Sequence, residues 1–389
     1  MQAAAAILVD AETGQVLYEK NADERRPIAS TTKIMTALVI LERGHPDAMC
    51  AVSKKAAQTP QSSIALAPGE TLRLEDLLTA VLVKSANDAA VAAAEGVAGS
   101  EEAFVAMMNA RAHELGATNT HFVNPDGLYD RQHYSSARDL AIITRQAMRI
   151  PRFCELARTR EATIPCAGAD RERLLVSKNK LLSIMPGADG VKTGYVKESG
   201  PCLVASASRD GWRLIAVLLD SPALWEEAPA LLGYGFDNFR PLQFAQRSKP
   251  AAWVDLRGGE KPRVSVVPRD SLMLVLPKWS RQEYAYVPRL DLTRSHFSAP
   301  VRAGQRMGRM VLTAGARELM AVDLVAGETV PRSLLSSLWL GMSRFTLGLV
   351  AAAMAVRGYC VATKKRRTRR LFVRLTPAQR EPRSGVLPQ

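Results

Sequence analysis

Three short groups of polar residues have the types and the spacing of a nucleophilic site. Ser30 and Lys33 stand three positions apart, Ser85 and Asn87 two positions apart, and Lys192-Thr193-Gly194 follows far downstream. A serine hydroxyl attacks a carbonyl when a nearby base takes its proton, and an amine kept neutral by burial is such a base. Lysine and threonine side chains are donors that suit an anion. Together these residues indicate acyl transfer through a covalent serine ester.

The first group precedes an apolar run, residues 34–41, that ends near Gly44. This pattern predicts a helix with a glycine stop. Ser30 would then lie in the first turn, with Lys33 one turn later on the same face and within reach of the hydroxyl. Chance also produces this spacing, since Ser177 begins a second S-x-x-K without a following apolar run. The alternative for Ser30 is an ordinary helix N-cap.

The other two groups fall between predicted helices and strands. Residues 74–84 carry leucine and valine on one helical face, and Ser85 and Asn87 interrupt that pattern before an alanine-rich run. Both polar tips can then point into one cavity, although a plain helix-to-helix turn is the alternative. Lys192-Thr193-Gly194 begins a series of β-prone runs with an Asp-Gly turn, which predicts a strand and a hairpin. Gly194 would let a ligand backbone come close to the strand.

The S-x-x-K, S-x-N and K-T-G motifs in this order are typical of serine penicillin-binding proteins and class A β-lactamases. Further segments support the likeness, namely residues 5–10, 122–128, 133–137 and 231–236. Residues 3–240 therefore resemble the D-alanyl-D-alanine carboxypeptidases among the low-molecular-weight penicillin-binding proteins. Residues 250–328 fit the small β-rich domain that follows in many members of that family.

The resemblance implies a role for each motif residue. Three of them are expected to be catalytic, namely Ser30, Lys33 and Ser85. Five are expected to bind the substrate, namely Asn87, Lys192, Thr193, Gly194 and Tyr195. The substrate would be the peptidoglycan pentapeptide stem, which loses its terminal D-alanine, and β-lactam antibiotics would acylate the same serine. Because the base in this superfamily is disputed, the role of Lys33 is a hypothesis. We expect no cofactor and no metal, since the histidines and cysteines show no ligand spacing.

One segment departs from the family pattern. Members usually carry an arginine shortly before the closing helix, where it helps to hold the substrate carboxylate, but residues 221–227 contain none and include two glutamates. Arg213 or Lys178 could compensate. This departure leaves open a membrane-tethered penicillin-binding sensor or a low-turnover binding protein. A β-lactamase is less favoured, because no Glu-x-x-Leu-Asn stands between the second and third motifs.

The coarse pattern predicts an α+β fold of the β-lactamase and transpeptidase type. Its antiparallel sheet would join a hairpin over residues 3–20 to strands over 186–220, with helices on both faces and a helical subdomain between. We predict four segments, namely a peptidase domain over 1–245, a small all-β domain over 246–330, a membrane anchor helix over 331–363 and a basic cytoplasmic tail over 364–389.

The net charge of +14 lies mostly in the tail, where residues 364–389 hold nine basic residues and one acid and so carry +8. We therefore expect no nucleic-acid partner. The apolar window 338–356 has Arg344 as its single charge, which predicts a spanning helix that holds the enzyme on the extracytoplasmic face of the cell membrane. The alternative is an amphipathic helix lying on the surface. No export signal precedes the first strand, so we interpret the start as late or truncated.

Overall fold

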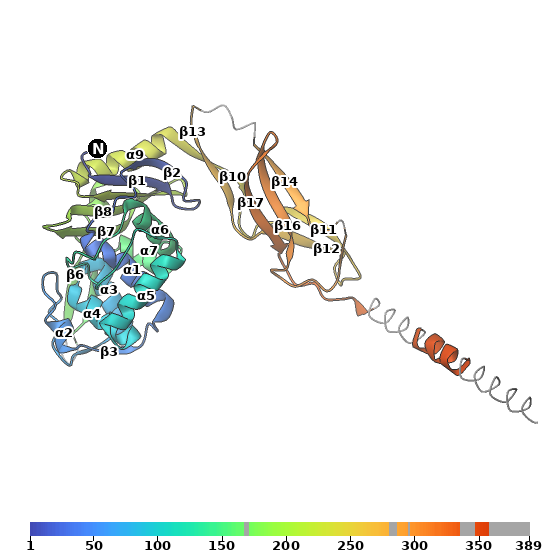
Figure 1. Ribbon diagram of the computed structural model, residues 1–389, viewed down its shortest axis with the longest axis horizontal. Helices are drawn as coiled ribbons and strands as arrows, with labels where there is room; N and C mark the ends of the chain where they lie inside the picture. The colour runs from blue at the N-terminus through green and yellow to red at the C-terminus, as the bar shows by residue number, and fades with distance from the viewer. Residues whose placement is uncertain (167–170, 280–285, 295, 335–346, 358–389) are drawn as a thin grey trace, which may run out of the picture. The chain divides into compact units, whose positions relative to one another are not determined.

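The structure, a computed structural model, divides into two compact units (Figure 1). It describes residues 1–166, 171–279, 286–294, 296–334 and 347–357. The first unit comprises Met1–Phe244 and Met273–Tyr284, and the second comprises Ala245–Leu272 and Ala285–Gln389. All three motifs belong to the first unit.

A five-stranded antiparallel sheet in the order β2-β1-β9-β8-β7 forms the centre of the first unit (Figure 1). Its strands are β1 (Ala5–Asp10), β2 (Val16–Lys20), β7 (Ala188–Val196), β8 (Gly200–Arg209) and β9 (Trp212–Leu219). Because β1 pairs with both β2 and β9, segments from the two ends of the unit share one sheet, as predicted. Asp210 and Gly211 both have positive φ and form the tight turn between β8 and β9.

Strand β1 shows why both faces of this sheet are covered. Ile7 and Val9 belong to one buried cluster and Leu8 to the other, since successive side chains of a strand point to opposite faces. An uninterrupted apolar strand therefore needs a partner layer on each side. Figure 1 shows α9 (Leu224–Asn238) on one face and α6 (Ala137–Ala147) on the other, which confirms the predicted layers.

Helices fill the segment between β2 and β7. Those not yet named are η1 (Ala29–Thr32), α1 (Lys33–Arg43), α2 (Lys54–Ala57), α3 (Leu74–Thr79), η2 (Ala80–Lys84), α4 (Asn87–Ala98), α5 (Glu101–Glu114), α7 (Pro151–Arg158) and α8 (Leu181–Ile184). Two small ribbons accompany them, namely β3 (Met49–Ala51) with β4 (Thr71–Arg73) and β5 (Glu161–Pro165) with β6 (Glu172–Val176). Every residue of α1 from Lys33 to Ile40 is buried, because α4, α5 and α6 pack around this helix.

The second unit contains a six-stranded sheet in the order β14-β16-β17-β12-β11-β15, which confirms an all-β module. Its strands are β11 (Ala252–Arg257), β12 (Arg263–Pro268), β14 (Tyr286–Leu292), β15 (Phe297–Ser298), β16 (Arg306–Ala314) and β17 (Arg317–Ala326). Fully buried apolar side chains such as Val264, Val311 and Leu324 form its core.

Strand β13 (Leu272–Pro277) differs from our expectation, which placed it in the all-β module. It pairs with β10 (Phe239–Ala245), and from Met273 on it groups with the first unit. The side chain of Gln15 explains this, because its Nε2 donates to the carbonyl of Val275 at 2.7 Å while its Oε1 accepts from the Val275 N–H at 3.0 Å. Both backbone groups of Val275 are thereby satisfied by the first unit.

Within the described residues, none of the helices has both the length and the apolar character that crossing a membrane requires. Residues 335–346 and 358–389, which include most of the predicted anchor and the whole basic tail, lie outside the described part of the chain.

Candidate active site

Ser30 lies on a short 3₁₀ turn, η1, that leads directly into α1. We predicted Ser30 in the first turn of the α-helix, but the α-helix begins at Lys33. Ala29 has φ 47°, the left-handed region that few residues with a side chain adopt, so the chain bends sharply just before Ser30. The predicted contact is present, since Ser30 Oγ lies 3.2 Å from Lys33 Nζ.

Lys33 is fully buried, and three oxygen atoms surround its nitrogen. Besides Ser30 Oγ, Nζ lies 2.6 Å from Oδ1 of Asn87 and 2.6 Å from the carbonyl oxygen of Asp126. Burial lowers the pKa of Lys33 from 10.5 to about 8; the Asp126 carboxylate opposes this shift and the Lys178 ammonium adds to it. About a tenth of the Lys33 amine is therefore neutral at pH 7.

Ser85 and Asn87 lie at a break between two helices. The predicted helix over residues 74–84 is α3 continued by a π-helical turn, η2, a wide turn that is frequent at functional sites. Ser85 follows with φ 64°, which ends the helix, and Asn87 begins α4. The amide of Asn87 is held at both ends, because its Nδ2 donates to the carbonyl of Pro60 at 2.9 Å. Its oxygen therefore faces Lys33.

Lys192 and Thr193 lie on β7, the strand at the edge of the sheet. Lys192 is buried, and its Nζ donates to Ser85 Oγ at 2.8 Å and to the carbonyl of Thr193 at 3.0 Å. Burial, together with the nearby charges of Lys33 and Lys178, lowers the pKa of Lys192 well below its usual value. Each motif serine therefore contacts one buried lysine amine.

Gly194 brings β7 close to the nucleophile turn. A Cβ atom at this position would lie 2.9 Å from the carbonyl oxygen of Ile28 and 3.0 Å from the backbone nitrogen of Ser30. Any other residue would push the edge strand away from Ser30. We predicted that this glycine lets a ligand come close to the strand. In the structure, the atoms nearest to it belong to the turn at Ile28, Ala29 and Ser30.

These elements enclose a cavity of about 380 Å³, a size that suits a small peptide end or a β-lactam. Six of the predicted site residues line it, namely Ser30, Ser85, Asn87, Thr193, Gly194 and Tyr195. Lys33 and Lys192 are buried behind this lining and reach it through their hydrogen bonds. The structure thus gathers all eight predicted residues at one place.

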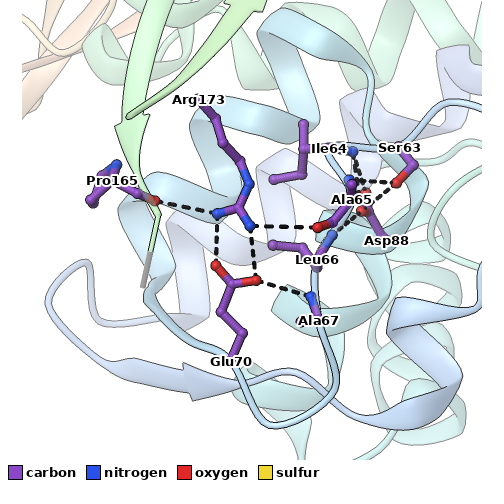
Figure 2. Close-up of polar contacts among 9 residues, drawn as sticks. All are labelled: Ser63, Ile64, Ala65, Leu66, Ala67, Glu70, Asp88, Pro165 and Arg173. Atoms are coloured by element: carbon purple, nitrogen blue, oxygen red, sulfur yellow. Dashed lines mark hydrogen bonds and ion pairs between the residues drawn. The ribbon is translucent and has the colours of Figure 1, made fainter. Parts of the chain in front are cut away.

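The loop over residues 60–67 supplies another wall of the cavity through Gln61 and Ser62. Figure 2 shows how the loop is held. The buried Asp88 carboxylate accepts from the Ser63 hydroxyl at 2.6 Å and from the backbone N–H groups of Ile64 and Leu66, each at 3.1 Å. Hydrogen bonds to a charged acceptor are stronger than neutral ones, so these bonds hold the loop in place at the cavity wall.

A bidentate salt bridge connects the C-terminal end of the same loop to strand β6. The guanidinium of Arg173 donates to both oxygens of Glu70, at 2.7 and 2.9 Å, and Glu70 also accepts from the Ala67 N–H (Figure 2). The Glu70 side chain is 6% exposed. A pair of parallel hydrogen bonds fixes the geometry as well as the distance.

The structure separates the two residues that we considered as substitutes for the family arginine. Arg213 donates to Asp189 at 2.9 Å and is not among the described residues that line the cavity. Lys178 lines the cavity, with Nζ 3.4 Å from Ser62 Oγ. Glu227 accepts from the Ser221 hydroxyl and the Ala3 N–H, so hydrogen bonds outside the cavity occupy its carboxylate.

Comparison with known proteins agrees with this geometry. Residues 1–223 match the family model described as D-alanyl-D-alanine carboxypeptidase, and residues 239–332 match the C-terminal domain of penicillin-binding protein 5. DacF of Bacillus subtilis is 34% identical over 85% of this chain and 87% of its own, and DacC of Escherichia coli is 31% identical over 85% and 84%. Penicillin-binding protein 5 of Haemophilus influenzae is similar in structure, with a TM-score of 0.67 and 29% identity over 85% of this chain and 98% of its own.

The fold and the cavity thus define a serine acyl-transfer enzyme of the transpeptidase type. The chain belongs to the D-alanyl-D-alanine carboxypeptidase family of low-molecular-weight penicillin-binding proteins. Its activity is serine-type D-Ala-D-Ala carboxypeptidation in peptidoglycan metabolism, and the family implies stem peptides as substrate and β-lactams as inhibitors.

Sequence reasoning missed several residues that shape the site. Asp126 contributes through its backbone carbonyl, and Asp88 acts through a loop remote in sequence. The signal for Asp126 was present, because residues 122–128 were among the segments that carried the family resemblance. Trp225 and Cys202 also line the cavity, and nothing in their local pattern indicates it.

Proposed function

We propose that Ser30 is the nucleophile of this carboxypeptidase, Lys33 its general base and Ser85 the proton relay to the leaving group. The observation that carries this proposal is the 3.2 Å contact between Ser30 Oγ and the buried Lys33 amine, whose pKa is lowered to about 8. A base with a pKa near the working pH combines availability with driving force for proton transfer.

The hydrogen-bond partners of Lys33 support its role as a neutral base. A neutral amine has two N–H donors and one lone pair. Asn87 Oδ1 and the Asp126 carbonyl, both at 2.6 Å, are acceptors for the two donors. The lone pair then faces the Ser30 hydroxyl, which donates to it. Asn87 in this arrangement orients the base, and its remaining capacity can hold the substrate amide.

The reaction then proceeds in two steps. Ser30 Oγ attacks the carbonyl carbon of the penultimate D-alanine while its proton moves to Lys33, and the backbone N–H groups of Ser30 and Tyr195 stabilise the oxyanion. The bond to the terminal D-alanine nitrogen breaks as Ser85, hydrogen-bonded to Lys192 at 2.8 Å, delivers its proton to that nitrogen. Ser85 takes a proton from the Lys33 ammonium in exchange, so Lys33 is again neutral for the hydrolysis step. Water then hydrolyses the acyl-serine ester and frees Ser30. A β-lactam acylates Ser30 in the same first step, and the ester that it forms is hydrolysed slowly.

We propose that the substrate carboxylate binds between Thr193 and Lys178, with Lys192 behind them and Gly194 keeping β7 close. Among the described residues that line the cavity, Lys178 is the cation, and Arg213 is paired with Asp189. A charge-assisted contact of this kind contributes about 1.5–3 kcal/mol. Its position in the lining supports Lys178, of the two candidates, as the residue that compensates for the missing arginine.

Replacing Lys178 with alanine is expected to raise KM for a D-Ala-D-Ala peptide about tenfold to a hundredfold, with a much smaller change in kcat. The reason is that a carboxylate contact binds ground state and transition state alike. Steady-state kinetics of D-alanine release measures this, with Lys178→Arg expected to retain the low KM. The matched control is Lys197→Ala, an equal charge change at an exposed position outside the cavity lining. Equal KM values for wild type and Lys178→Ala would refute the assignment.

Incubating the protein with a diacyl-L-Lys-D-Ala-D-Ala peptide and with labelled penicillin tests the proposed turnover. We expect each enzyme molecule to release more than one D-alanine from the peptide. The penicillin label should be on Ser30 and should be lost slowly. A stable label without D-alanine release would indicate the sensor alternative. Rapid destruction of penicillin would indicate a β-lactamase.

We further propose the division into a peptidase domain over residues 1–245, a β-rich spacer or interaction domain over 246–330, a membrane anchor over 331–363 and a cytoplasmic basic tail over 364–389. The enzyme would then act on the extracytoplasmic face. The division of the structure between Phe244 and Ala245 supports the first boundary, and the separate family match over residues 239–332 supports a second domain. Apolar composition followed at once by dense positive charge supports the anchor.

Truncation after Pro331 is expected to give a protein that stays in solution and still binds penicillin, whereas carbonate should leave the full chain in the membrane pellet. Arg344 costs at most a few kcal/mol in mid-helix, which the surrounding apolar residues outweigh. The measurement is penicillin labelling of supernatant and pellet, with the full chain at high salt as the control for electrostatic adsorption. Extraction of the full chain by carbonate would show a surface-bound helix instead.

A further inference from the structure

A chain of hydrogen bonds behind the nucleophile turn ends on the carbonyl of Ala29. The backbone N–H of Val123 donates to Nδ1 of His133 at 3.2 Å, and Nε2 of His133 lies 2.8 Å from the hydroxyl oxygen of Thr32. The Thr32 hydroxyl donates to the Ala29 carbonyl oxygen at 2.8 Å. Thr32 and His133 are both buried, and the mechanism proposed above uses neither.

The direction of every bond in this chain is determined. A backbone N–H can only donate, so Nδ1 of His133 is an acceptor and carries no proton. Burial lowers the pKa of His133 from 6.5 to about 4, so the ring is neutral and its single proton is on Nε2. The Nε2–H therefore donates to Thr32, whose own proton is left for Ala29.

The last acceptor belongs to the peptide unit that also carries the Ser30 N–H. The carbonyl of Ala29 and the N–H of Ser30 are parts of one planar group, so a bond that fixes the carbonyl fixes the direction of the N–H as well. Ala29 has a left-handed φ of 47°, a conformation that is unfavourable for a residue with a side chain and persists where neighbours enforce it. Gly127 packs so closely that a Cβ there would lie 2.0 Å from the Ala29 oxygen.

We propose that Thr32 and His133 are positioning residues that orient the Ala29–Ser30 peptide so that the Ser30 N–H points at the oxyanion. This inference rests on the proposed function, in which that N–H stabilises the developing charge. An oxyanion donor works only when it is aimed in advance at the place where charge appears. The competing interpretation is that the chain merely supports the fold of the turn.

Thr32→Val tests the proposal, because valine keeps the shape of threonine and removes the hydroxyl. We expect the rate constant of acylation by penicillin to fall about tenfold to a hundredfold with an unchanged Kd for the initial complex. The infrared stretching frequency of the acyl-enzyme carbonyl should rise, since a weaker oxyanion contact polarises that bond less. Thr32→Ser should restore both values.

Two further comparisons separate positioning from support of the fold. Thr31→Val is the matched control, because the Thr31 hydroxyl donates to the carbonyl of Ile28 at 2.6 Å, one peptide unit away from Ser30. His133→Gln, which keeps a donor near the place of Nε2, should acylate faster than His133→Asn, and thermal melting would check that both are folded. Equal rate constants and equal carbonyl frequencies for Thr32→Val and Thr31→Val would overturn the proposal. A wild-type protein that forms no acyl-enzyme would instead refute the proposed function.

Discussion

Replacing Ser30 with alanine is expected to abolish the covalent penicillin adduct and to lower D-alanine release by about 10⁴-fold or more. The reason is that Ser30 Oγ is the atom that forms the ester. It lies 3.2 Å from Lys33 Nζ and is the hydroxyl that we assign as the proton donor to that amine. The oxyanion donors and the substrate contacts would remain and account for any residual rate. Intact mass after penicillin treatment, together with a D-alanine assay, measures both effects.

The second S-x-x-K provides the matched control. Ser177 has the same spacing to Lys180, but its Oγ accepts from the Asn179 N–H at 3.3 Å and it is not among the described cavity-lining residues. Ser177→Ala is therefore expected to keep full acylation. An adduct that persists in Ser30→Ala, or that maps to Ser177, would contradict the assignment of the nucleophile.

Local sequence patterns predicted most helices and strands of the first unit, because the spacing of apolar residues follows from which side chains are buried. Strand β1 is apolar from Ala5 to Val9, and α1 carries an apolar run over residues 34–41 that only Thr36 interrupts; both segments are buried as those patterns require, apart from the end of the α1 run. Strand β13 could not be assigned in this way. It pairs with β10, and the Gln15 side chain that bonds to Val275 lies 260 positions away; a β-prone run contains no information about either partner.

The site shows the same division between local and distant determinants. Side-chain motifs identified Ser30, Ser85 and Lys192, since their chemistry depends on residue type. The carbonyl of Asp126 could not be identified by residue type, because any residue has one. The 3₁₀ turn at Ala29 and the π turn before Ser85 also depend on packing against other segments, so helical periodicity alone predicted a regular helix in both places.

The pH dependence of acylation follows from the lowered pKa of Lys33. If the neutral amine is the base, the acylation rate should rise with pH in proportion to its neutral fraction, with a midpoint at about 8. Between pH 6 and pH 10 this predicts an increase of about a hundredfold. Lys33→Arg should lose about 10³-fold in acylation rate at every pH, because arginine remains protonated. Stopped-flow acylation by a chromogenic penicillin gives the profile.

Two charge changes at fixed geometry test whether that midpoint belongs to Lys33. Asp126→Asn keeps the backbone carbonyl but removes a carboxylate that raises the pKa of Lys33, so the midpoint should move to lower pH. Lys178→Ala removes an ammonium that lowers this pKa, so the midpoint should move to higher pH. Opposite shifts of one profile are expected only if the titrating group faces both charges. A flat profile, or activity retained in Lys33→Arg, would assign the base to another group.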